Sequence, residues 1–402
     1  MSGSSDLVVA SERCPVCSAE TVSTICELPS YPLTELFVPA PSAEVKGAGV
    51  RHQLTSADQV VLYCDECCHA FLKNVISPEY LYHQDNYHTK SSASAGSMVS
   101  LSNFAAFISS NLQTKPNFAL DVGGNDSSFL ELIGALGGAI VDPNALSSEG
   151  SPFQQVRTFF HMLQPEELEQ SVDVICSSHT LEHVVDVHRF FETATNFKEQ
   201  DIFFLQFPSL ELMLESSRYD LIHHQHLHYF SLKSISILAA SHDLAVVDYL
   251  FDTDHYGTLM VALRPKSRVA AITPSPLEPR SFDIKYIQSG YEAFLALTKR
   301  ENSAVEKLPN LFCYGASLMF PICRYYFPSL DQSGGILDQD EHKSALRFAD
   351  VDLPILLDSA DRKLDGMSIF ISAVATKRAH RKIMQSLINR SAKYIFSPFG
   401  VF

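Results

Sequence analysis

The chain has 402 residues, of which 46% are hydrophobic and 19% charged, which is typical of a soluble globular protein with two or three domains. Its formal net charge of −16 argues against sequence-independent nucleic-acid binding, because such a surface repels phosphate groups. The sequence has no apolar run as long as a membrane span and no secretion signal at its start, so we expect a cytoplasmic protein without a membrane partner.

Residues 1–95 contain two C-x-x-C motifs, "CPVC" at Cys14 and Cys17 and "CDEC" at Cys64 and Cys67. Each motif directs two thiolates toward one centre, and the two together provide the ligands of a tetrahedral zinc site. In a reducing cytosol this spacing favours a metal site over disulfide bonds. We therefore predict an N-terminal module with a structural zinc ion, in which Cys68 is an alternative ligand. Four buried thiols without a metal are the competing interpretation.

Residues 96–265 alternate between apolar strand patterns and helical patterns, which indicates an α/β fold with a largely parallel sheet and helices on both faces. Two closing strands at the end of this unit favour the class I methyltransferase sheet. A proline-rich linker and a charged helix near residues 285–307 then occupy residues 266–308. Residues 309–402 open with "LFCYGAS", a strand and a glycine turn, and predict a second, smaller Rossmann-like α/β domain.

The segment "DVGGNDSSFL" (residues 121–130) predicts a strand, a Gly-Gly turn and a helix, which allows a helix N-terminus to approach a ligand closely. Asp142 ends the next strand, about twenty residues after Asp121, where an acid can bond the two hydroxyl groups of a ribose. Because the pattern is neither G-x-G-x-x-G nor a P-loop, S-adenosylmethionine fits better than NAD or ATP. The candidate cofactor residues are Asp121, Gly123, Gly124, Asn125, Asp142 and Ser178. A tight turn without a ligand is the alternative.

The segment "LIHHQHLHYFSL" (residues 221–232) holds four histidines, His223, His224, His226 and His228. It follows a predicted strand, on the side of the sheet where ligands bind in α/β proteins. From the residues alone, these imidazoles are metal ligands, acid–base groups or buried polar side chains. His183, at the end of an earlier strand in "SSHTLEH", faces cofactor or substrate, or is a polar core residue.

At these residues the sequence resembles the S-adenosylmethionine-dependent C-methyltransferases that act on nucleotide-linked deoxyketosugars. The resemblance extends over nearly the whole chain. It includes both cysteine motifs, "DNYHTKSSAS", "DVGGNDSSFL" with "IVDP", "TLEHVVDVHRF", "YDLIHHQHLHYFSL" and "FCYGAS". It implies a zinc module, a class I methyltransferase domain and a C-terminal Rossmann-like domain that helps to enclose the active site. It also implies a nucleotide-linked sugar as the substrate.

The resemblance further implies a mechanism, in which a base removes the proton next to the sugar ketone and the enolate carbon accepts the methyl group. His226 matches the histidine that we expect to be the base. His183 matches a histidine near the substrate, and Tyr87 matches a tyrosine from the N-terminal segment. His223 and Gln225 complete the predicted catalytic set.

Three positions depart from the family pattern. His223 replaces a tyrosine, Gln225 replaces the glutamate of the family's Tyr-His-Glu-His run, and Ser127 replaces a glycine. A glutamine cannot exchange a proton at neutral pH, although it can bond a hydroxyl or a ketone. An O- or N-methyltransferase on a related sugar and a non-catalytic protein that binds a sugar nucleotide or S-adenosylmethionine are therefore alternatives. A metal-dependent hydrolase built on the histidines is a further one.

Overall fold

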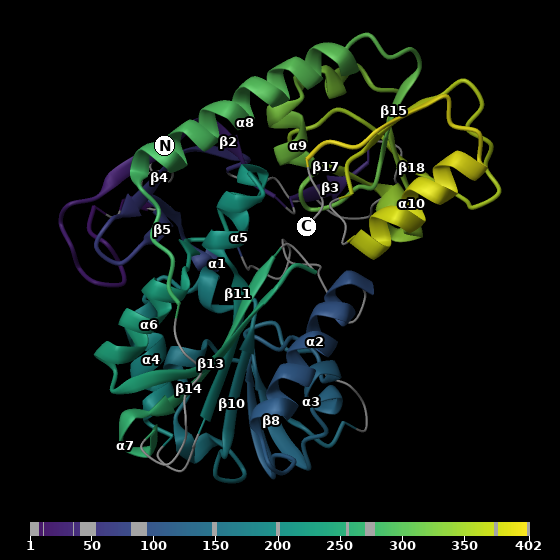
Figure 1. Ribbon diagram of the computed structural model, residues 1–402. Helices are drawn as coiled ribbons and strands as arrows, with labels where there is room; N and C mark the ends of the chain where they lie inside the picture. Colours follow the sequence, from purple (N-terminus) through teal and green to yellow (C-terminus); the bar gives the residue numbers. More distant parts are fainter. Residues whose placement is uncertain are drawn as a thin grey trace, which may run out of the picture.

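The computed structural model describes residues 8–10, 12–34, 36–40, 54–81, 95–146, 151–197, 202–254, 257–269, 278–373 and 377–399. Figure 1 shows a large twisted sheet with helices on both faces, and two smaller units that lie together at one end of it. The predicted α/β class is confirmed.

The large sheet has seven strands in the order β13-β14-β11-β10-β7-β8-β9. Their bounds are β7 Phe118–Val122, β8 Gly137–Val141, β9 Gln154–Val156, β10 Val174–Ser178, β11 Ile202–Pro208, β13 Leu244–Asp252 and β14 Thr258–Pro265. The first five strands along the chain are parallel, whereas β14 runs antiparallel between β11 and β13. The sheet therefore has the strand order of class I methyltransferases, in which one antiparallel strand lies next to the edge. The closing strand pair predicts this order.

Two helical layers cover this sheet because its central strands are apolar on both faces, as expected for buried parallel strands. Leu120 of β7 packs in one core with Phe190 and Leu238, whereas Ala119 packs in another with Phe104 and Phe129. The first layer contains α4 (Val187–Thr195) and α6 (Leu232–Ser241), and the second contains α2 (Ala95–Asn111) and α3 (Ser128–Leu132). The short helix α7 (Lys266–Val269) follows the last strand.

The N-terminal sheet has four strands in the order β12-β5-β4-β2. Their bounds are β2 Ser23–Pro32, β4 Ser56–Cys64, β5 His69–Leu72 and β12 His228–Tyr229. A separate pair joins β1 (Val8–Ala10) to β6 (Asn74–Ile76), and α1 (Pro78–Leu81) follows it. Because β12 belongs to the histidine segment, this segment is hydrogen-bonded directly to the N-terminal sheet.

The C-terminal sheet has five parallel strands in the order β18-β16-β15-β19-β20. Their bounds are β15 Leu311–Tyr314, β16 Ile336–Asp338, β18 Ile355–Leu357, β19 Ser368–Ile371 and β20 Tyr394–Phe396. Helices α9 (Phe320–Tyr326) and α10 (Lys377–Asn389) accompany it, and β17 (Leu346–Phe348) pairs with β3 (Phe37–Pro39). The parallel order agrees with the predicted Rossmann-like unit.

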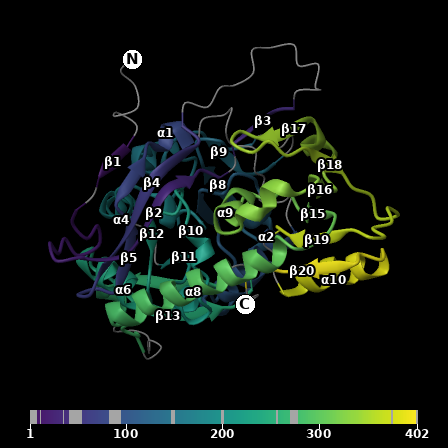
Figure 2. The same cartoon turned by 90° about the horizontal axis from the view of Figure 1, so that it is seen from above.

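Helix α8 (Ile284–Val305) is the predicted charged helix, and it spans the N-terminal and C-terminal units (Figure 2). Its Gln288 side chain donates a hydrogen bond to the carbonyl of Thr24 at 2.8 Å. Farther along, Phe294 packs edge-on against Tyr326 of α9, with ring centroids 4.9 Å apart. The helix therefore joins the two small units into one body beside the large sheet.

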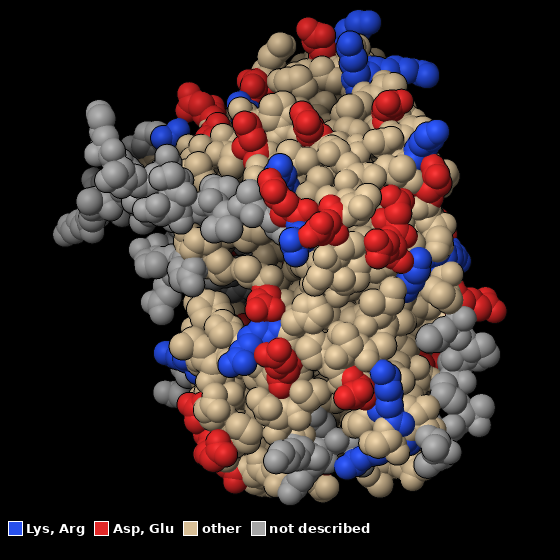
Figure 3. All heavy atoms as spheres, turned by 90° about the vertical axis from the view of Figure 1, so that its left-hand side faces the viewer, with Lys and Arg blue, Asp and Glu red and all other residues tan. Residues whose placement is uncertain are grey.

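The distribution of charge on the surface and the length of the helices bear on the possible partners of the protein. Figure 3 shows one face of the molecule, on which acidic and basic side chains are interspersed, with a small group of basic side chains at the top of the view. Among the helices of the described residues, none combines the length and the apolar character needed to cross a bilayer.

Candidate functional site

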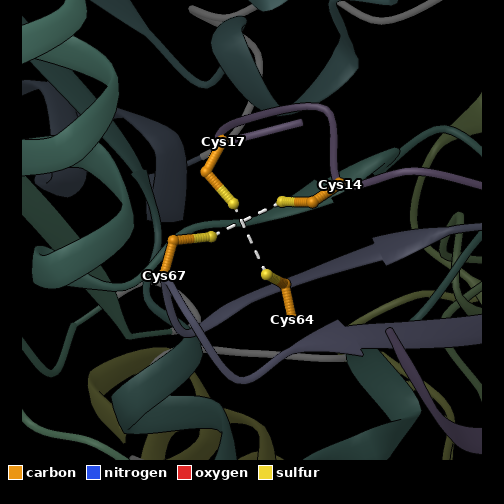
Figure 4. A group of neighbouring side chains, drawn as sticks. All are labelled: Cys14, Cys17, Cys64 and Cys67. Atoms are coloured by element: carbon orange, nitrogen blue, oxygen red, sulfur yellow. Dashed lines mark hydrogen bonds between the residues drawn. The ribbon is translucent and has the colours of Figure 1, made fainter. Parts of the chain in front are cut away.

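The four predicted zinc ligands converge on one point (Figure 4). The Sγ atoms of Cys14 and Cys67 are 3.5 Å apart, and those of Cys17 and Cys64 are also 3.5 Å apart. Cys64 ends β4, and Cys67 lies in the tight turn that leads into β5. Both motifs therefore present their thiols to the same centre.

This cysteine cluster fits a zinc ion. With Zn–S bonds of about 2.3 Å, the sulfur atoms of a tetrahedral site are about 3.8 Å apart, close to the spacing found here. Burial raises the pKa of Cys64 to about 12, whereas the contact with Cys67 lowers the pKa of Cys14 to about 6. A cation at the centre would hold the Cys64 sulfur as a thiolate as well. Cys68 is not part of the cluster: its sulfur lies 3.6 Å from Nζ of Lys233, so its role as an alternative ligand is not supported.

A cavity opens at the carboxyl ends of β7 and β10, where the sequence predicts the cofactor. Its walls contain Ser97, Ser100, Leu101, Asp121, Gly123, Gly124, Asp126, Phe129, Ser178 and His179. Gly123 and Gly124 cannot be replaced by a residue with a side chain unless their neighbours move. A Cβ atom on Gly123 would lie 2.0 Å from Oγ1 of Thr180, and one on Gly124 would lie 2.2 Å from Oδ2 of Asp121.

Asp121 lines this cavity and is buried, and Asn125 is a buried residue of the turn that follows Asp121. Within the described residues, Oδ2 of Asp121 and Oδ1 of Asn125 have no hydrogen-bond partner. Burial holds the pKa of Asp121 well above its ordinary value, and the negative charges of nearby Asp142 and Asp126 are a second, smaller cause. Unpaired buried acceptors of this kind are costly unless a ligand supplies donors. The amino and hydroxyl groups of S-adenosylmethionine are such donors.

Asp142 directly follows β8 and Ser178 ends β10, as predicted, but of the two only Ser178 is among the residues that line the cavity. Oδ1 of Asp142 accepts a hydrogen bond from the backbone of Asn144 at 2.6 Å. Burial raises the pKa of the Asp142 carboxyl group. The Ser178 hydroxyl donates its proton to Oε1 of Gln206 at 2.9 Å, so this proton is already engaged within the protein.

Two of the four clustered histidines are structural. His224 donates from Nε2 to the carbonyl of Tyr31 at 3.0 Å and accepts at Nδ1 from the Gln59 amide at 3.3 Å. His228 donates from Nε2 to the carbonyl of Val184 at 2.8 Å, and its Nδ1 lies 3.1 Å from Nε2 of His69. Because both ring nitrogens are engaged, neither histidine is available for proton transfer.

The other two histidines meet His183. The ring centroids of His223 and His226 are 3.8 Å apart, and those of His183 and His226 are 4.9 Å apart. His183 lies in the turn η4 (Leu181–His183) after β10, and its Nδ1 lies 2.7 Å from the carbonyl oxygen of Gln225. The structure therefore brings together His183, His223, Gln225 and His226. Tyr87, the remaining predicted catalytic residue, lies outside the described residues.

Burial keeps this cluster uncharged. It lowers the pKa of His223 to about 3 and holds the pKa of His226 well below its ordinary value, with neighbouring histidines as a second cause. Within the described part of the chain, Nδ1 of His226 has no hydrogen-bond partner. His226 is therefore a neutral imidazole at pH 7, the protonation state that a base requires.

Gln225 is held as a neutral polar group. Its Oε1 accepts from the hydroxyl of Thr34, and it lies 3.1 Å from Nδ1 of His223. A carboxylate at this position would accept the same two bonds, so the substitution preserves the local geometry while removing the charge.

The sequence interpretation missed Glu182, which is fully buried within this cluster. Its Oε1 lies 3.2 Å from Nδ1 of His179 and 4.0 Å from Nε2 of His183. Burial raises the pKa of Glu182 to about 7. The sequence feature that could have identified Glu182 is its position in "SSHTLEH", shortly after the end of a strand. An acid followed by a histidine is common on protein surfaces, however, and only the fold shows that this one is buried.

His179 joins the two halves of the site. It lines the cofactor cavity, and it also contacts Glu182, which neighbours His183 and His226. His179 thus connects the wall of the cavity to the histidine cluster, and a ligand in the cavity would lie beside the imidazole of His179. This arrangement is suited to proton abstraction from a substrate placed next to a bound cofactor.

Comparison with known proteins agrees with the sheet order. Residues 101–249 match the family described as "Methyltransferase domain". A C-methyltransferase, NovU of Streptomyces niveus, is 24% identical over 286 residues, which are 68% of this chain and 65% of NovU. The match therefore spans just under two thirds of the relative's length. The chain contains a methyltransferase domain.

Solved structures with a similar backbone include two methyltransferases with bound S-adenosylhomocysteine. The N-methyltransferase NodS from Bradyrhizobium japonicum is 12% identical with a TM-score of 0.35, and the match covers 46% of this chain and 94% of NodS. The magnesium protoporphyrin IX methyltransferase from Synechocystis is 11% identical with a TM-score of 0.33, covering 42% of this chain and 83% of its own.

Proposed function

We propose that the protein uses S-adenosylmethionine to methylate a nucleotide-linked ketosugar at the carbon next to the ketone. The observation that supports this most directly is the connection of the wall of the glycine-lined cavity to a cluster of neutral histidines, through His179. The cited relative NovU, a C-methyltransferase, supports a carbon acceptor. The sugar substrate rests on the resemblance of the sequence motifs.

Residues at and near the cavity would hold the methyl donor. Asp142 would accept hydrogen bonds from the ribose hydroxyls, and Gly123 and Gly124 leave room for the donor to approach the backbone. The unpaired oxygens of Asp121 and Asn125 would accept from its polar groups. Bound S-adenosylmethionine supplies the electrophilic methyl group, and the protein supplies orientation.

His226 would act as the base. A neutral imidazole with an unpaired ring nitrogen can accept the proton next to the ketone. His183 and His223 both donate from Nδ1 to oxygen atoms of Gln225, so each presents the lone pair of Nε2 and can accept a hydrogen bond from a substrate hydroxyl group. Once His226 has taken the proton, its imidazolium is the group that can donate to the enolate oxygen. Tyr87 stays a predicted contributor from the N-terminal segment.

Transfer to a hydroxyl or amino group of a related sugar is the second candidate, and Gln225 favours it. The Gln225 side chain is a neutral hydrogen-bonding group between Thr34 and His223, where the resemblance predicts an acid. Deprotonating a hydroxyl needs one base and no enolate stabilisation. His226 alone would suffice for that reaction.

Product analysis distinguishes the two candidates. The zinc-loaded protein is incubated with S-adenosylmethionine and a panel of nucleotide-linked 4-ketosugars and their 4-hydroxy counterparts. The C-methylation proposal expects products only from ketosugars, with the new methyl carbon bonded to carbon by NMR. It also expects the proton next to the ketone to exchange with deuterated solvent without the methyl donor. Products from the hydroxy sugars alone, without exchange, would establish the second candidate.

A further inference from the structure

One feature of the site is unexplained by methyl transfer, namely a buried carboxyl group among histidines that has no cationic partner among the described residues. Glu182 is fully buried, and its Oε2 has no hydrogen-bond partner within the described part of the chain. A buried carboxylate without such partners is costly, whereas a coordinated cation would compensate it.

The geometry around Glu182 matches a three-ligand metal site. One potential ligand atom from each of Glu182, His183 and His226 lies within 4.8 Å of the others. Ligand atoms about 2.1 Å from a tetrahedral ion are about 3.4 Å apart, so the 4.0 Å between Nε2 of His183 and Oε1 of Glu182 must shorten only slightly.

The surrounding contacts orient the ligands as metal sites do. His183 donates from Nδ1 to the carbonyl of Gln225 at 2.7 Å, which leaves the lone pair of its Nε2 on the side of Glu182. The Glu182 carboxyl group is itself positioned by Nδ1 of His179 at 3.2 Å. Nδ1 of His226 has no other partner among the described residues.

We propose that Glu182, His183 and His226 form a second metal site, which binds a divalent transition-metal ion of the zinc class with open positions toward the cavity. Two imidazoles and one carboxylate are ligands that such ions accept, and three protein ligands leave room for water or a substrate oxygen. This site is distinct from the cysteine cluster in ligands and position.

Metal binding and proton abstraction exclude each other at His226. A neutral imidazole has one free lone pair, and once that pair binds a metal the other nitrogen carries a proton. The metal-loaded protein therefore lacks its base, so the ion inhibits methyl transfer. The inhibition rests on the proposed function, whereas the binding does not.

Calorimetry with Zn²⁺ tests the binding on full-length protein whose cysteine cluster is already loaded. We expect one further zinc ion per chain, and an affinity at least about tenfold weaker in both Glu182→Gln and His226→Gln. His161→Gln, at an exposed histidine outside the site, and His242→Gln should bind as the wild type does. His242 is the informative control because its Nε2 lies 2.9 Å from Nδ1 of His188, a competing pair.

Three results would overturn the site. These are no second zinc ion in the wild type, unchanged affinity in Glu182→Gln and His226→Gln, or loss of the ion in His242→Gln. Circular dichroism and retained cysteine-bound zinc confirm that each variant is folded.

Kinetic measurements test the predicted inhibition. One equivalent of additional Zn²⁺ should inhibit wild-type methyl transfer, competitively with the sugar. Full activity with the second ion bound would refute the inhibition, and absence of any methyl transfer would refute the proposed function while leaving the binding result intact.

Discussion

Nδ1 of His183 lies 2.7 Å from the backbone carbonyl oxygen of Gln225, a contact between segments 42 residues apart. Because a carbonyl can only accept, His183 carries its proton on Nδ1 when neutral, and the lone pair of Nε2 is directed elsewhere. The contact fixes the turn after β10 against the histidine segment. Together with the bond from the Leu227 amide to the Glu182 carbonyl at 2.8 Å, this contact holds His226 beside the turn.

Replacing His226 by glutamine tests the proposed base. The variant keeps a polar side chain of similar volume but cannot accept the substrate proton, so we expect the rate of methyl transfer to fall by about 10²–10⁴-fold. The affinity for S-adenosylmethionine should change little, since His226 is not among the residues that line the cofactor cavity. Single-turnover kinetics and calorimetry measure the two effects. A near-normal rate would exclude His226 as the base.

His224→Gln is the matched control, two residues away. His224 bonds to Tyr31 and Gln59 within the N-terminal sheet and faces no ligand. We expect a loss of about 1–3 kcal/mol in the free energy of unfolding, because a buried hydrogen bond is removed. Per folded molecule the catalytic rate should be close to normal. A catalytic loss as large as that of His226→Gln would show that the two histidines do not differ in role.

Cys64→Ser should release the metal and destabilise the N-terminal sheet, because the ion would join the turn between β4 and β5 to the segment of Cys14 and Cys17. Cys68→Ser is its control, because the Cys68 sulfur contacts Lys233 outside the cluster. Metal content by mass spectrometry and thermal unfolding report the outcome. If Cys64→Ser retained one zinc ion per chain, or if Cys68→Ser lost it, the assignment of ligands would be wrong.

Gly124→Ala tests the cofactor cavity. The new Cβ atom would lie 2.2 Å from Oδ2 of Asp121, so the carboxylate must move out of its buried position. We expect the affinity for S-adenosylmethionine to fall at least about tenfold, or about 1.4 kcal/mol. Gly366→Ala is the control for a glycine without neighbours: its backbone is left-handed, with φ of +76°, so the substitution costs stability, but no atom lies within 4 Å of the new Cβ. Equal affinities in both variants would remove Gly124 from the site.

The binding of S-adenosylmethionine should depend on pH through Asp142. Burial raises the pKa of this carboxyl group, so it becomes protonated at a higher pH than an ordinary aspartate. The ionised form accepts ribose hydroxyls best, hence affinity is full above the raised pKa and decreases as the pH falls through it. Calorimetry between pH 8 and pH 5 follows this decrease. In Asp142→Asn the affinity should be weaker and the pH dependence flatter; an unchanged profile would assign the titration to another group.

Much of the fold could be predicted from the sequence because its signals are local. Buried strands such as β7 and β11 are apolar except for one residue each, and the Gly-Gly turn after β7 has a steric cause at Thr180 and Asp121. The spacing of the C-x-x-C motifs likewise predicts that four thiols meet. These features need no knowledge of distant contacts.

Which of the histidines are structural and which remain available for chemistry could not be predicted from the sequence. His224 and His228 are structural only because Tyr31, Gln59, His69 and Val184, all distant in sequence, supply their partners. Glu182 was missed for a similar reason: the turn that carries it is covered by the histidine segment, whose Leu227 amide donates to the Glu182 carbonyl at 2.8 Å. Long-range contacts, rather than spacing within a motif, decide which polar side chains remain available for chemistry.

The most direct test of the central claim is titration calorimetry of the folded, zinc-loaded protein with S-adenosylmethionine and S-adenosylhomocysteine. We predict one binding site per chain for each, with dissociation constants on the order of micromolar, about −8 kcal/mol. Absence of binding by both compounds would contradict the methyltransferase proposal and leave the glycine-lined cavity to another ligand.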